Sequence, residues 1–324
     1  MNKPAPVGSK GMRLGVVILN WENADDTMAC LAQLQHVREQ FPQTRIVVVD
    51  NGSQDNSIEI LHKNQYQHVY YLMPLAENRG FAAGVNAGVQ WLLDQMSEYV
   101  LILNSDTLLT ADFLMPLWRC LVTHETAGIA TPKIRYTDAP DHIWYAGGMF
   151  QQPRFLGTMV GIGKKDQGQF DEPRVVDFAT GCCILVKRAV FETIGLFDED
   201  FFLYHEDVDF CLRAQQAGFQ TWYCPESLIW HRVSFSTKDR TSMRIRLYSR
   251  NRFVFFAKHI HGWRWAWVLA LEGIRLVRKV MIHFLHGRLC DALAYTRGVY
   301  EGFWWAARYK LTNQCTKTPD TSSH

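Results

Sequence analysis

The chain has 324 residues, of which 48% are hydrophobic and 20% are charged, and its formal net charge is +2. These fractions are those of a folded globular protein, which excludes a chain that is disordered throughout, and the length predicts one large domain with an appendage. Eight cysteines occur without a C-x-x-C pair or a zinc-like His/Cys spacing, and residues 1–13 lack the apolar segment of a signal peptide. We therefore expect reduced thiols in a cytoplasmic protein with a flexible N-terminus.

The charges are distributed unevenly along the chain. Residues 1–230 hold 17 Lys/Arg and 27 Asp/Glu, whereas residues 231–310 hold 16 Lys/Arg and 4 Asp/Glu. This asymmetry indicates an anionic partner for the basic C-terminal segment.

Short apolar strands alternate with helices in the first part of the chain. Leu14–Leu19 and Arg45–Val49 are continuous apolar runs typical of buried strands, and Val69–Leu72 is a third candidate. Asp25–Gln40 has helical spacing, and a second helix is expected to begin at Asp55–Ser57. This order predicts a mostly parallel α/β sheet with helices on both faces.

Polar residues follow several of the predicted strands. Asn20–Asn23 and Asp50–Ser53 come after the first two, and the apolar run Tyr99–Leu103 ends in Asn104-Ser105-Asp106. Ligands of parallel sheets bind beyond the carboxyl ends of the strands. Asp106 therefore suits a divalent ion that bridges to a diphosphate, with a helix cap for the helix near Asp112 as the alternative.

Glu77–Gly88 is rich in small residues that allow a ligand to approach the backbone, and Arg79 suits a phosphate. A glycine-punctuated helix start explains the same residues equally well. Further along, residues 131–176 are irregular, and we predict that part of them forms a loop or a hairpin over a cleft.

The stretch Phe201–Arg213 contains three carboxylates, Glu206, Asp207 and Asp209, beside aromatic residues. Like charges gather where water is scarce only if a cation, hydrogen-bond donors or a proton compensates. The cluster is therefore a candidate for a metal or a general base, with a solvated helix start as the alternative. His231 becomes a candidate metal ligand only if it lies beside Asp106.

Six motifs occur in the following order: Asp50-Asn51-Gly52-Ser53, Asn78–Gly84, Asn104-Ser105-Asp106, Gly195–Asp198, Tyr204–Asp209, and Pro225 followed by His231. Together they resemble the family 2 inverting glycosyltransferases of the GT-A fold, particularly the rhamnosyltransferase-like branch that builds bacterial surface polysaccharides. The resemblance covers residues 14–260 and includes Ser249-Arg250-Asn251-Arg252, which is similar to an Arg-Asn element after the catalytic domain.

This resemblance implies a Rossmann-like sheet that binds a dTDP- or UDP-sugar donor. It makes Asp106 the main carboxylate for Mg²⁺ or Mn²⁺ and His231 a further ligand or a neighbour of the pyrophosphate. Asn104 stands where the family often has the first Asp of D-x-D, which weakens the expected metal site. The implied donor-binding residues are Asn20, Glu22, Asp50, Arg79, Gly80, Asn104 and Asp106.

The candidate general base is Asp207, which would take the proton of an acceptor hydroxyl as that oxygen attacks opposite the leaving diphosphate. Glu206 and Asp209 would orient the acceptor or structure the loop. Because Glu206 and Asp207 are adjacent, a shift of one residue would exchange their roles.

Trp263–Leu285 is apolar, but charges interrupt it before it reaches the roughly 20 apolar residues of a spanning helix. Its apolar stripe has helical spacing and consists of Trp267, Leu271, Ile274, Val277, Met281 and Leu285. The pattern predicts a helix at an anionic membrane surface or one that packs on protein, and no nucleic-acid partner. The expected units are a catalytic domain over 14–240, this helical segment over 241–310, and a disordered tail over 311–324.

The sequence thus predicts a cytoplasmic, membrane-peripheral inverting glycosyltransferase that moves a sugar such as L-rhamnose to a glycan or lipid-linked acceptor. The alternative enzyme is a sugar-phosphate nucleotidyltransferase, which would need a basic glycine-rich loop where Asn20–Asn23 stands. A non-catalytic sugar-nucleotide-binding protein on the same fold is the third interpretation.

Overall fold

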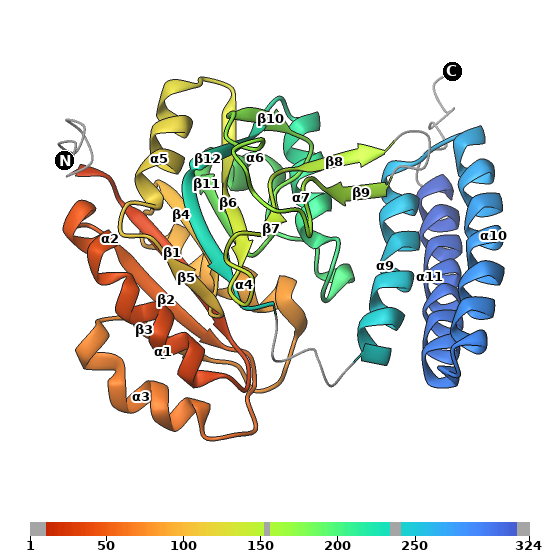
Figure 1. Cartoon of the computed structure of the whole chain (residues 1–324), viewed down its shortest axis with the longest axis horizontal. Coiled ribbons are helices and arrows are strands. Elements are labelled where there is room, and N and C mark those ends of the chain that lie inside the picture. Colours follow the sequence, from red (N-terminus) through yellow and green to blue (C-terminus); the bar gives the residue numbers. More distant parts are fainter. Residues whose placement is uncertain (1–10, 152–155, 234–240, 316–324) are drawn as a thin grey trace, which may run out of the picture. The chain divides into compact units, whose positions relative to one another are not determined.

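The computed structural model describes residues 11–151, 156–233 and 241–315, and the chain divides into two compact units (Figure 1). The first unit consists of Met1–Phe202 and Glu206–Ser236. The second consists of Thr237–His324 together with the tripeptide Leu203–His205. Three residues directly before the carboxylate cluster therefore belong to the C-terminal unit.

A ten-stranded sheet forms the centre of the first unit, and its first half is parallel, with the order β4-β1-β2-β3. These strands are β1 (Leu14–Asn20), β2 (Arg45–Asp50), β3 (Tyr71–Pro74) and β4 (Tyr99–Asn104). In register, Asn20 pairs with Asp50, and Leu19 pairs with Asn104. The polar residues predicted at the strand ends therefore share one edge of the sheet.

The other half of the sheet is mixed, with the order β10-β12-β6-β11-β4, and β5 and β7 pair at its side. Its strands are β5 (Thr107–Leu109), β6 (Ala127–Tyr136), β7 (Ile143–Tyr145), β10 (Arg174–Val176), β11 (Cys183–Lys187) and β12 (Gln220–His231). Because β11 runs antiparallel to β4, its start lies at the same edge as the end of β4.

The irregular segment predicted over residues 131–176 is only partly correct. Its first residues belong to β6, a central strand in which Lys133 is buried. The segment does contain a hairpin, formed by β8 (Gly148–Gln151) and β9 (Leu156–Met159). Lys133 interrupts the apolar run of β6, so a search for continuous apolar runs does not predict this strand.

Helices cover both faces of the sheet, as predicted. Buried apolar side chains form two core clusters, one on each face of the sheet. The first includes residues of α1 (Ala24–Gln33), α2 (Gln35–Gln40), α3 (Ser57–His68) and α5 (Leu114–Thr123). The second includes residues of α4 (Gly80–Asp94), α6 (Arg188–Ile194) and α7 (Glu206–Gln216). Within β1, Ile18 packs in the first cluster and Val17 in the second. The single helix expected over 25–40 is two helices, because the N–H of Leu34 bonds three residues back, to Leu31.

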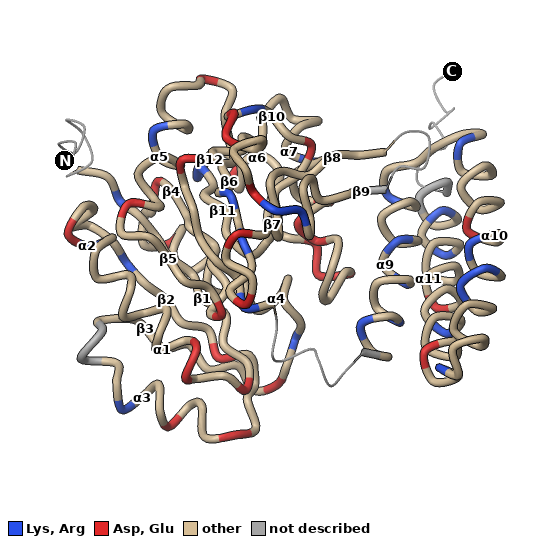
Figure 2. The backbone as a smooth tube through the Cα atoms, in the orientation of Figure 1, with Lys and Arg blue, Asp and Glu red and all other residues tan. Residues whose placement is uncertain are grey.

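The described part of the C-terminal unit contains α9 (Thr241–His259), α10 (Trp263–Leu285) and α11 (Leu289–Cys315). The bounds of α10 match the helical stripe seen in the sequence. Helix α11 continues past residue 310, where a disordered tail was expected, and residues 316–324 lie outside the described part. Lys and Arg recur along these helices (Figure 2). Among the described residues, no helix has the length and apolar character needed to cross a bilayer.

Helices α9 and α11 approach each other closely at two glycines. A Cβ on Gly298 would lie 2.2 Å from the carbonyl oxygen of Arg246, and one on Gly302 would lie 2.5 Å from another carbonyl oxygen of α9. Because these glycines are about one turn apart, they allow contact between the two backbones. A buried ion pair between Arg252 and Glu272 also ties α9 to α10.

Candidate functional site

Side-chain hydrogen bonds join the ends of β1 and β2. Nδ2 of Asn20 donates to Oδ2 of Asp50 at 2.7 Å, and both residues are fully buried. The Asp50 carboxylate also accepts from the backbone N–H (3.0 Å) and the hydroxyl (2.7 Å) of Ser53. The same hydroxyl accepts the N–H of Glu22, an exposed residue with a φ of 52°. These bonds fix the loop that the sequence assigned to the nucleotide.

The start of α4 is organised by Asn51 and Gly80. The Asn51 side chain accepts the N–H of Arg79 at 3.0 Å and donates to the Gly80 carbonyl at 3.1 Å. Gly80 has a φ of 84°, and a Cβ there would lie 2.4 Å from the carbonyl oxygen of Phe202, so the position requires glycine. The Arg79 guanidinium lies 3.3 Å from Glu199, and both are half-exposed. An exposed pair of this kind is weak, which leaves Arg79 available to an anion.

Asp106 and His231 meet beyond the end of β4 and at the end of β12. Nε2 of His231 lies 3.1 Å from Oδ1 of Asp106, and both side chains are largely buried. Neither ring nitrogen of His231 has a hydrogen-bond partner among the described residues, so the contact is not a well-directed hydrogen bond. The ring of Trp144, on β7, packs edge-on against His231 with 4.4 Å between the ring centroids. Asp106 does not cap α5, whose N-cap is Phe113.

The Asp106–His231 pair fits part of a divalent metal site. Carboxylate oxygen and neutral imidazole nitrogen are ligands for such ions, and a buried imidazole without hydrogen-bond partners suits a bound ligand. Across residues 11–151, 156–233 and 241–315, no cluster of three or more His, Cys, Asp or Glu could hold an ion. A bound diphosphate and water would therefore have to supply the remaining ligands.

Asp207 lies in the first turn of α7 and is oriented by two backbone donors. Its Oδ2 accepts the N–H of Gly181 at 2.9 Å, and its Oδ1 accepts the N–H of Val208 at 2.8 Å. Burial raises the pKa of the Asp207 carboxyl above its ordinary value, and the hydrogen bonds oppose this shift only in part. The Asp207 carboxylate is therefore fixed in orientation and has an increased affinity for protons.

The other two carboxylates of the cluster are not solvated. Glu206 is buried, and Asp209 is fully buried. Asp209 pairs with Arg213 at 2.7 Å, and Arg213 also donates to the carbonyl oxygens of Ile194 and Leu196. The carboxylates do lie at a helix start, as that alternative expected, but the burial of Glu206 and Asp209 shows that this start is not solvated. Through Arg213, Asp209 helps to hold the loop before α7.

Gly181 connects Asp207 to the end of β4. The carbonyl oxygen of the next residue, Cys182, accepts the N–H of Asn104 at 2.8 Å. Asn104 stands two residues before Asp106. The candidate base and the candidate metal ligand therefore both border the turn at the start of β11.

The tripeptide before α7 is held by Asn251 of α9. The buried amide of Asn251 donates from Nδ2 to the carbonyl oxygens of Leu203 (2.8 Å) and Tyr204 (2.9 Å). Tyr204 and His205 have φ values of 74° and 75°, a conformation that is unfavourable for residues with a side chain. Strain directly before the carboxylate cluster is therefore maintained by contacts of the C-terminal unit.

Three residues at the site were not singled out from the sequence: Gly181, Trp144 and Arg232. The N–H of Arg232 donates to the carbonyl oxygen of Asp106 at 3.0 Å, and its guanidinium pairs with Asp26 of α1. Its backbone thus holds the segment that carries Asp106, while its charge is paired with Asp26. Its position directly after His231 was the available signal, whereas nothing local marked Gly181 or Trp144.

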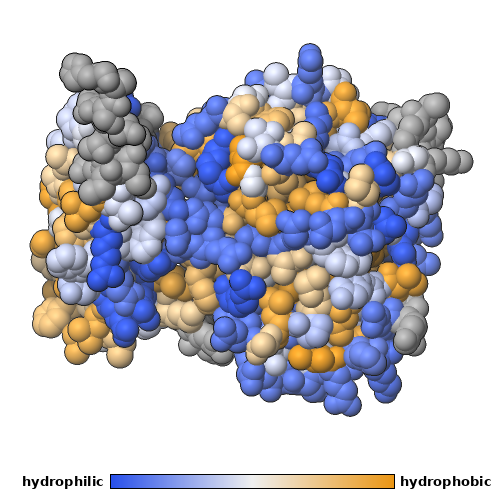
Figure 3. Space-filling model, turned by 180° about the vertical axis from the view of Figure 1, so that it is seen from behind, coloured by the Kyte–Doolittle hydropathy of each residue, from blue (hydrophilic) through white to orange (hydrophobic). Residues whose placement is uncertain are grey.

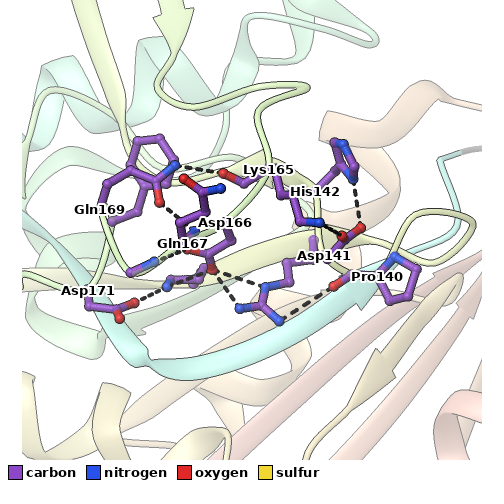
Figure 4. Close-up of polar contacts among 12 residues, drawn as sticks. Pro140, Asp141, His142, Lys165, Asp166, Gln167, Gln169 and Asp171 are labelled. Atoms are coloured by element: carbon purple, nitrogen blue, oxygen red, sulfur yellow. Dashed lines mark hydrogen bonds and ion pairs between the residues drawn. The ribbon is translucent and has the colours of Figure 1, made fainter.

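Buried ion pairs support the strand that carries Trp144. The Lys133 ammonium lies 3.0 Å from Asp166, and Arg135 binds the same carboxylate at 2.6 Å (Figure 4). Burial alone would raise the pKa of Asp166, but hydrogen bonds from Arg135 and Lys133 outweigh it and lower the pKa. Because residues 163 and 164, just before Asp166, are hydrogen-bonded to β7, these pairs also hold Trp144 near His231.

Comparison with known proteins identifies relatives over most of the chain. The model of the family Glycosyl transferase family 2 matches residues 22–195. The chain is 26% identical over 297 residues to the low-salt glycan biosynthesis hexosyltransferase Agl10 of Haloferax volcanii, which covers 85% of this chain and 90% of that protein. It is 25% identical over 270 residues to the N-acetylglucosaminyl-diphospho-decaprenol L-rhamnosyltransferase of Mycobacterium tuberculosis, covering 72% and 83%. It is also 24% identical over 225 residues to the dTDP-rhamnosyl transferase RfbF of Shigella flexneri, covering 66% and 71%.

A solved structure supports the fold. The mannosyltransferase PcManGT from Pyrobaculum calidifontis, in complex with GDP-Man and Mn²⁺, has a TM-score of 0.56 and 17% sequence identity, over 98% of this chain and 85% of that one. The architecture expected from the sequence, a GT-A sheet with helices on both faces, is confirmed.

Proposed function

The chain belongs to glycosyl transferase family 2, and we propose that this glycosyltransferase moves a sugar, with inversion, from a nucleotide donor to a lipid-linked glycan. Two relatives are named for rhamnosyl transfer, one of them as a dTDP-rhamnosyl transferase, which supports L-rhamnose as the sugar and a dTDP-linked donor. The name of one of these relatives also gives its acceptor, N-acetylglucosaminyl-diphospho-decaprenol, which is lipid-linked. An acceptor of this kind would keep the enzyme at a membrane surface, and the proposed location is the inner face of the cell membrane.

The observation that carries the proposal is the pairing of Asp106 with His231, at 3.1 Å and without a hydrogen-bond partner for the imidazole among the described residues. A buried imidazole without hydrogen-bond partners suits a bound ligand. The diphosphate of a donor, bound together with a cation, would supply that ligand and lie at the strand ends where α/β sheets bind nucleotides. Asp207 borders the same turn through Gly181.

The donor's diphosphate carries negative charge that grows as the sugar leaves. Asp106 and His231 would hold a divalent ion, and Mn²⁺ in the complex of PcManGT supports Mn²⁺ as the ion. When bound, Mg²⁺ or Mn²⁺ supplies Lewis-acid stabilisation of the phosphate oxygens. Arg79 would add positive charge, since its guanidinium is half-exposed at the start of α4. Asn20, Glu22, Asp50 and Asn104 would complete the donor site, with Asp50 fixing the loop.

Asp207 would act on the acceptor. The acceptor hydroxyl oxygen forms a bond to the anomeric carbon on the face opposite the diphosphate, the bond to the diphosphate breaks, and the hydroxyl proton passes to Asp207. The hydrogen bond from Gly181 aims the carboxylate, and burial increases its proton affinity, which suits a general base. Glu206 would support the acceptor, whereas Asp209 acts through Arg213.

A donor screen tests this function. The purified enzyme is incubated with dTDP-rhamnose, UDP-sugars and GDP-mannose, together with a polyprenyl-diphosphate-linked N-acetylglucosamine acceptor, with Mn²⁺ or with a chelator. We expect release of nucleoside diphosphate with one donor class only, dependent on the acceptor, and a product of inverted anomeric configuration. Retained configuration in the product, or no transfer from any donor, would contradict the proposal.

A further inference from the structure

Two stripes of exposed apolar side chains lie on the C-terminal helices. The stripe on α10 consists of Trp263, Trp267, Ile274, Val277, Met281 and Leu285, with exposed fractions between 47% and 77%. The stripe on α11 consists of Leu289, Leu293, Tyr300, Trp304 and Leu311, with exposed fractions between 50% and 71%. We call the two stripes together the apolar face. Figure 3 shows hydrophobic residues gathered over these helices at the left of the view.

The apolar side of α10 points away from the packed side of the helix. Members of its stripe recur at spacings of three, four and seven residues, which places them on one side. The opposite side carries Val268 and Glu272, the two buried residues of α10. Helices that pack in water normally bury their apolar side, so α10 presents the reverse arrangement.

The α10 stripe borders a groove whose lining extends to α11. Its lining includes Val277 and Met281 of the α10 stripe and Thr296 of α11, and its volume is about 490 Å³. Thr296 lies three residues after Leu293 and four residues before Tyr300, which places it on the side of the α11 stripe. The groove therefore connects the α10 stripe to the side of α11 that carries the second stripe.

Positive charge accompanies the apolar face. Arg278 and Arg288 are exposed, and Arg278 directly follows Val277 of the stripe. The carboxylates of α10 and α11 already have partners. Glu272 pairs with Arg252, Glu301 pairs with Arg246, and Asp291 accepts a hydrogen bond from the hydroxyl of Ser242. The unit thus offers apolar area and basic side chains to a partner that is apolar and anionic.

We propose that the apolar face docks on the surface of a phospholipid bilayer that contains anionic headgroups. Exposed Trp and Tyr beside Arg and Lys are the residue types that favour the bilayer interface, where apolar side chains enter the acyl boundary and cations meet phosphate. A second copy of the chain would instead bring two positively charged units together. The docking rests on the proposed function in one respect: it would bring the enzyme to a lipid-linked acceptor.

Vesicle flotation tests the docking with the full chain. Wild type is mixed with vesicles of phosphatidylcholine alone, or of phosphatidylcholine with phosphatidylglycerol, and floated at low and high salt. We expect flotation with the anionic vesicles, weaker at high salt. The variant Ile274→Ser/Val277→Ser/Leu293→Ser should partition about tenfold less or worse, and Arg278→Glu/Arg288→Glu should lose the dependence on phosphatidylglycerol. The matched control is Val122→Ser/Val175→Ser, which alters exposed apolar residues of the first unit and should float like wild type.

Three readouts separate the possible outcomes. Circular dichroism and thermal unfolding test whether each variant folds. We expect that all do, because every substituted side chain is exposed. Light scattering reports self-association: a wild-type dimer that the triple variant disperses, without flotation of wild type, would overturn the proposal. Equal flotation of the triple variant and wild type would also overturn it. Sugar transfer to a water-soluble acceptor should be unchanged in the triple variant, and flotation without any transfer would count against the proposed function alone.

Discussion

The backbone N–H of Gly181 donates a 2.9 Å hydrogen bond to Oδ2 of Asp207. This bond favours the ionised carboxylate, but burial favours the neutral acid more strongly, and the pKa of Asp207 is raised above 3.8. A general base must be ionised to accept a proton. We therefore expect kcat to fall on the acid side at a pH clearly above 3.8, in a pH–rate profile measured at saturating donor and acceptor. The control Asp138→Asn, at an exposed carboxyl, should keep the profile.

The same pKa shift affects stability. Because the pKa is raised in the folded protein, the folded state binds more protons than the unfolded chain between pH 3.8 and the raised value, and the free energy of unfolding decreases as pH rises through that range. Asp207→Asn removes this contribution. Its thermal unfolding temperature at neutral pH should equal or exceed that of wild type, and a clear loss would show that the carboxylate stabilises the fold instead.

Removal of the imidazole tests the metal site. His231→Gln should bind dTDP or UDP about 10- to 100-fold more weakly than wild type in the presence of Mn²⁺, since one of two protein ligands is lost. Titration calorimetry with a chelator should show similar affinities for both proteins. His142→Ala, at a half-exposed histidine that pairs with Asp141, is the control. An equal loss of affinity with and without Mn²⁺ would argue for a direct contact between His231 and the nucleotide.

The hydrogen bonds of Asn251 lead to a prediction about the loop before α7. Asn251→Ala leaves the carbonyl oxygens of Leu203 and Tyr204 without this donor, which should lower the free energy of unfolding by about 2 kcal/mol. The strained loop would relax, and we expect kcat to decrease about tenfold, because small displacements of a catalytic group are costly. Donor KM should change little. A larger effect on donor KM than on kcat would contradict this role, and the exposed Arg244→Ala in α9 serves as control.

The glycines of α11 provide a matched pair with α10. Gly298→Ala places a methyl group 2.2 Å from the carbonyl oxygen of Arg246 and should lower the free energy of unfolding by about 1–3 kcal/mol. Gly273→Ala has open space around the added carbon and should raise it by about 0.5–1 kcal/mol, because alanine favours the helix. Urea unfolding followed by circular dichroism measures both, and the same sign for the two variants would disprove the close contact.

The parallel half of the sheet could be predicted because its strands are continuous apolar runs between helical segments. The strand β6 could not, since Lys133 is tolerated in the core through ion pairs with Asp166 and Asp171, partners 33 and 38 residues away that no local pattern reveals. The break at Leu34 is similar, because the apolar spacing of the helix continues across it.

The site residues that belong to recognisable motifs could be predicted from the sequence. The contacts that orient them could not, because they depend on how distant segments pack. Asp106 and His231 were brought together by resemblance, and the 3.1 Å contact agrees with that expectation. The N–H of Gly181 donates to the Asp207 side chain, and the Asn251 side chain donates to the carbonyl oxygen of Leu203, so both bonds join a side chain to the backbone of a distant segment. The sequence marked Asp207 and Asn251, but their backbone partners depend on where the chain passes, which no local pattern indicates.

In the proposed reaction, Asp207 takes the proton from the acceptor hydroxyl. The most direct measurement compares nucleoside diphosphate release by wild type, Asp207→Asn and Glu206→Gln with the donor and acceptor found in the screen, together with donor affinity by calorimetry. We predict that Asp207→Asn loses turnover by about 10²- to 10⁴-fold with wild-type donor affinity and stability, and that Glu206→Gln loses less. Wild-type turnover by Asp207→Asn, with transfer abolished in Glu206→Gln, would contradict the account.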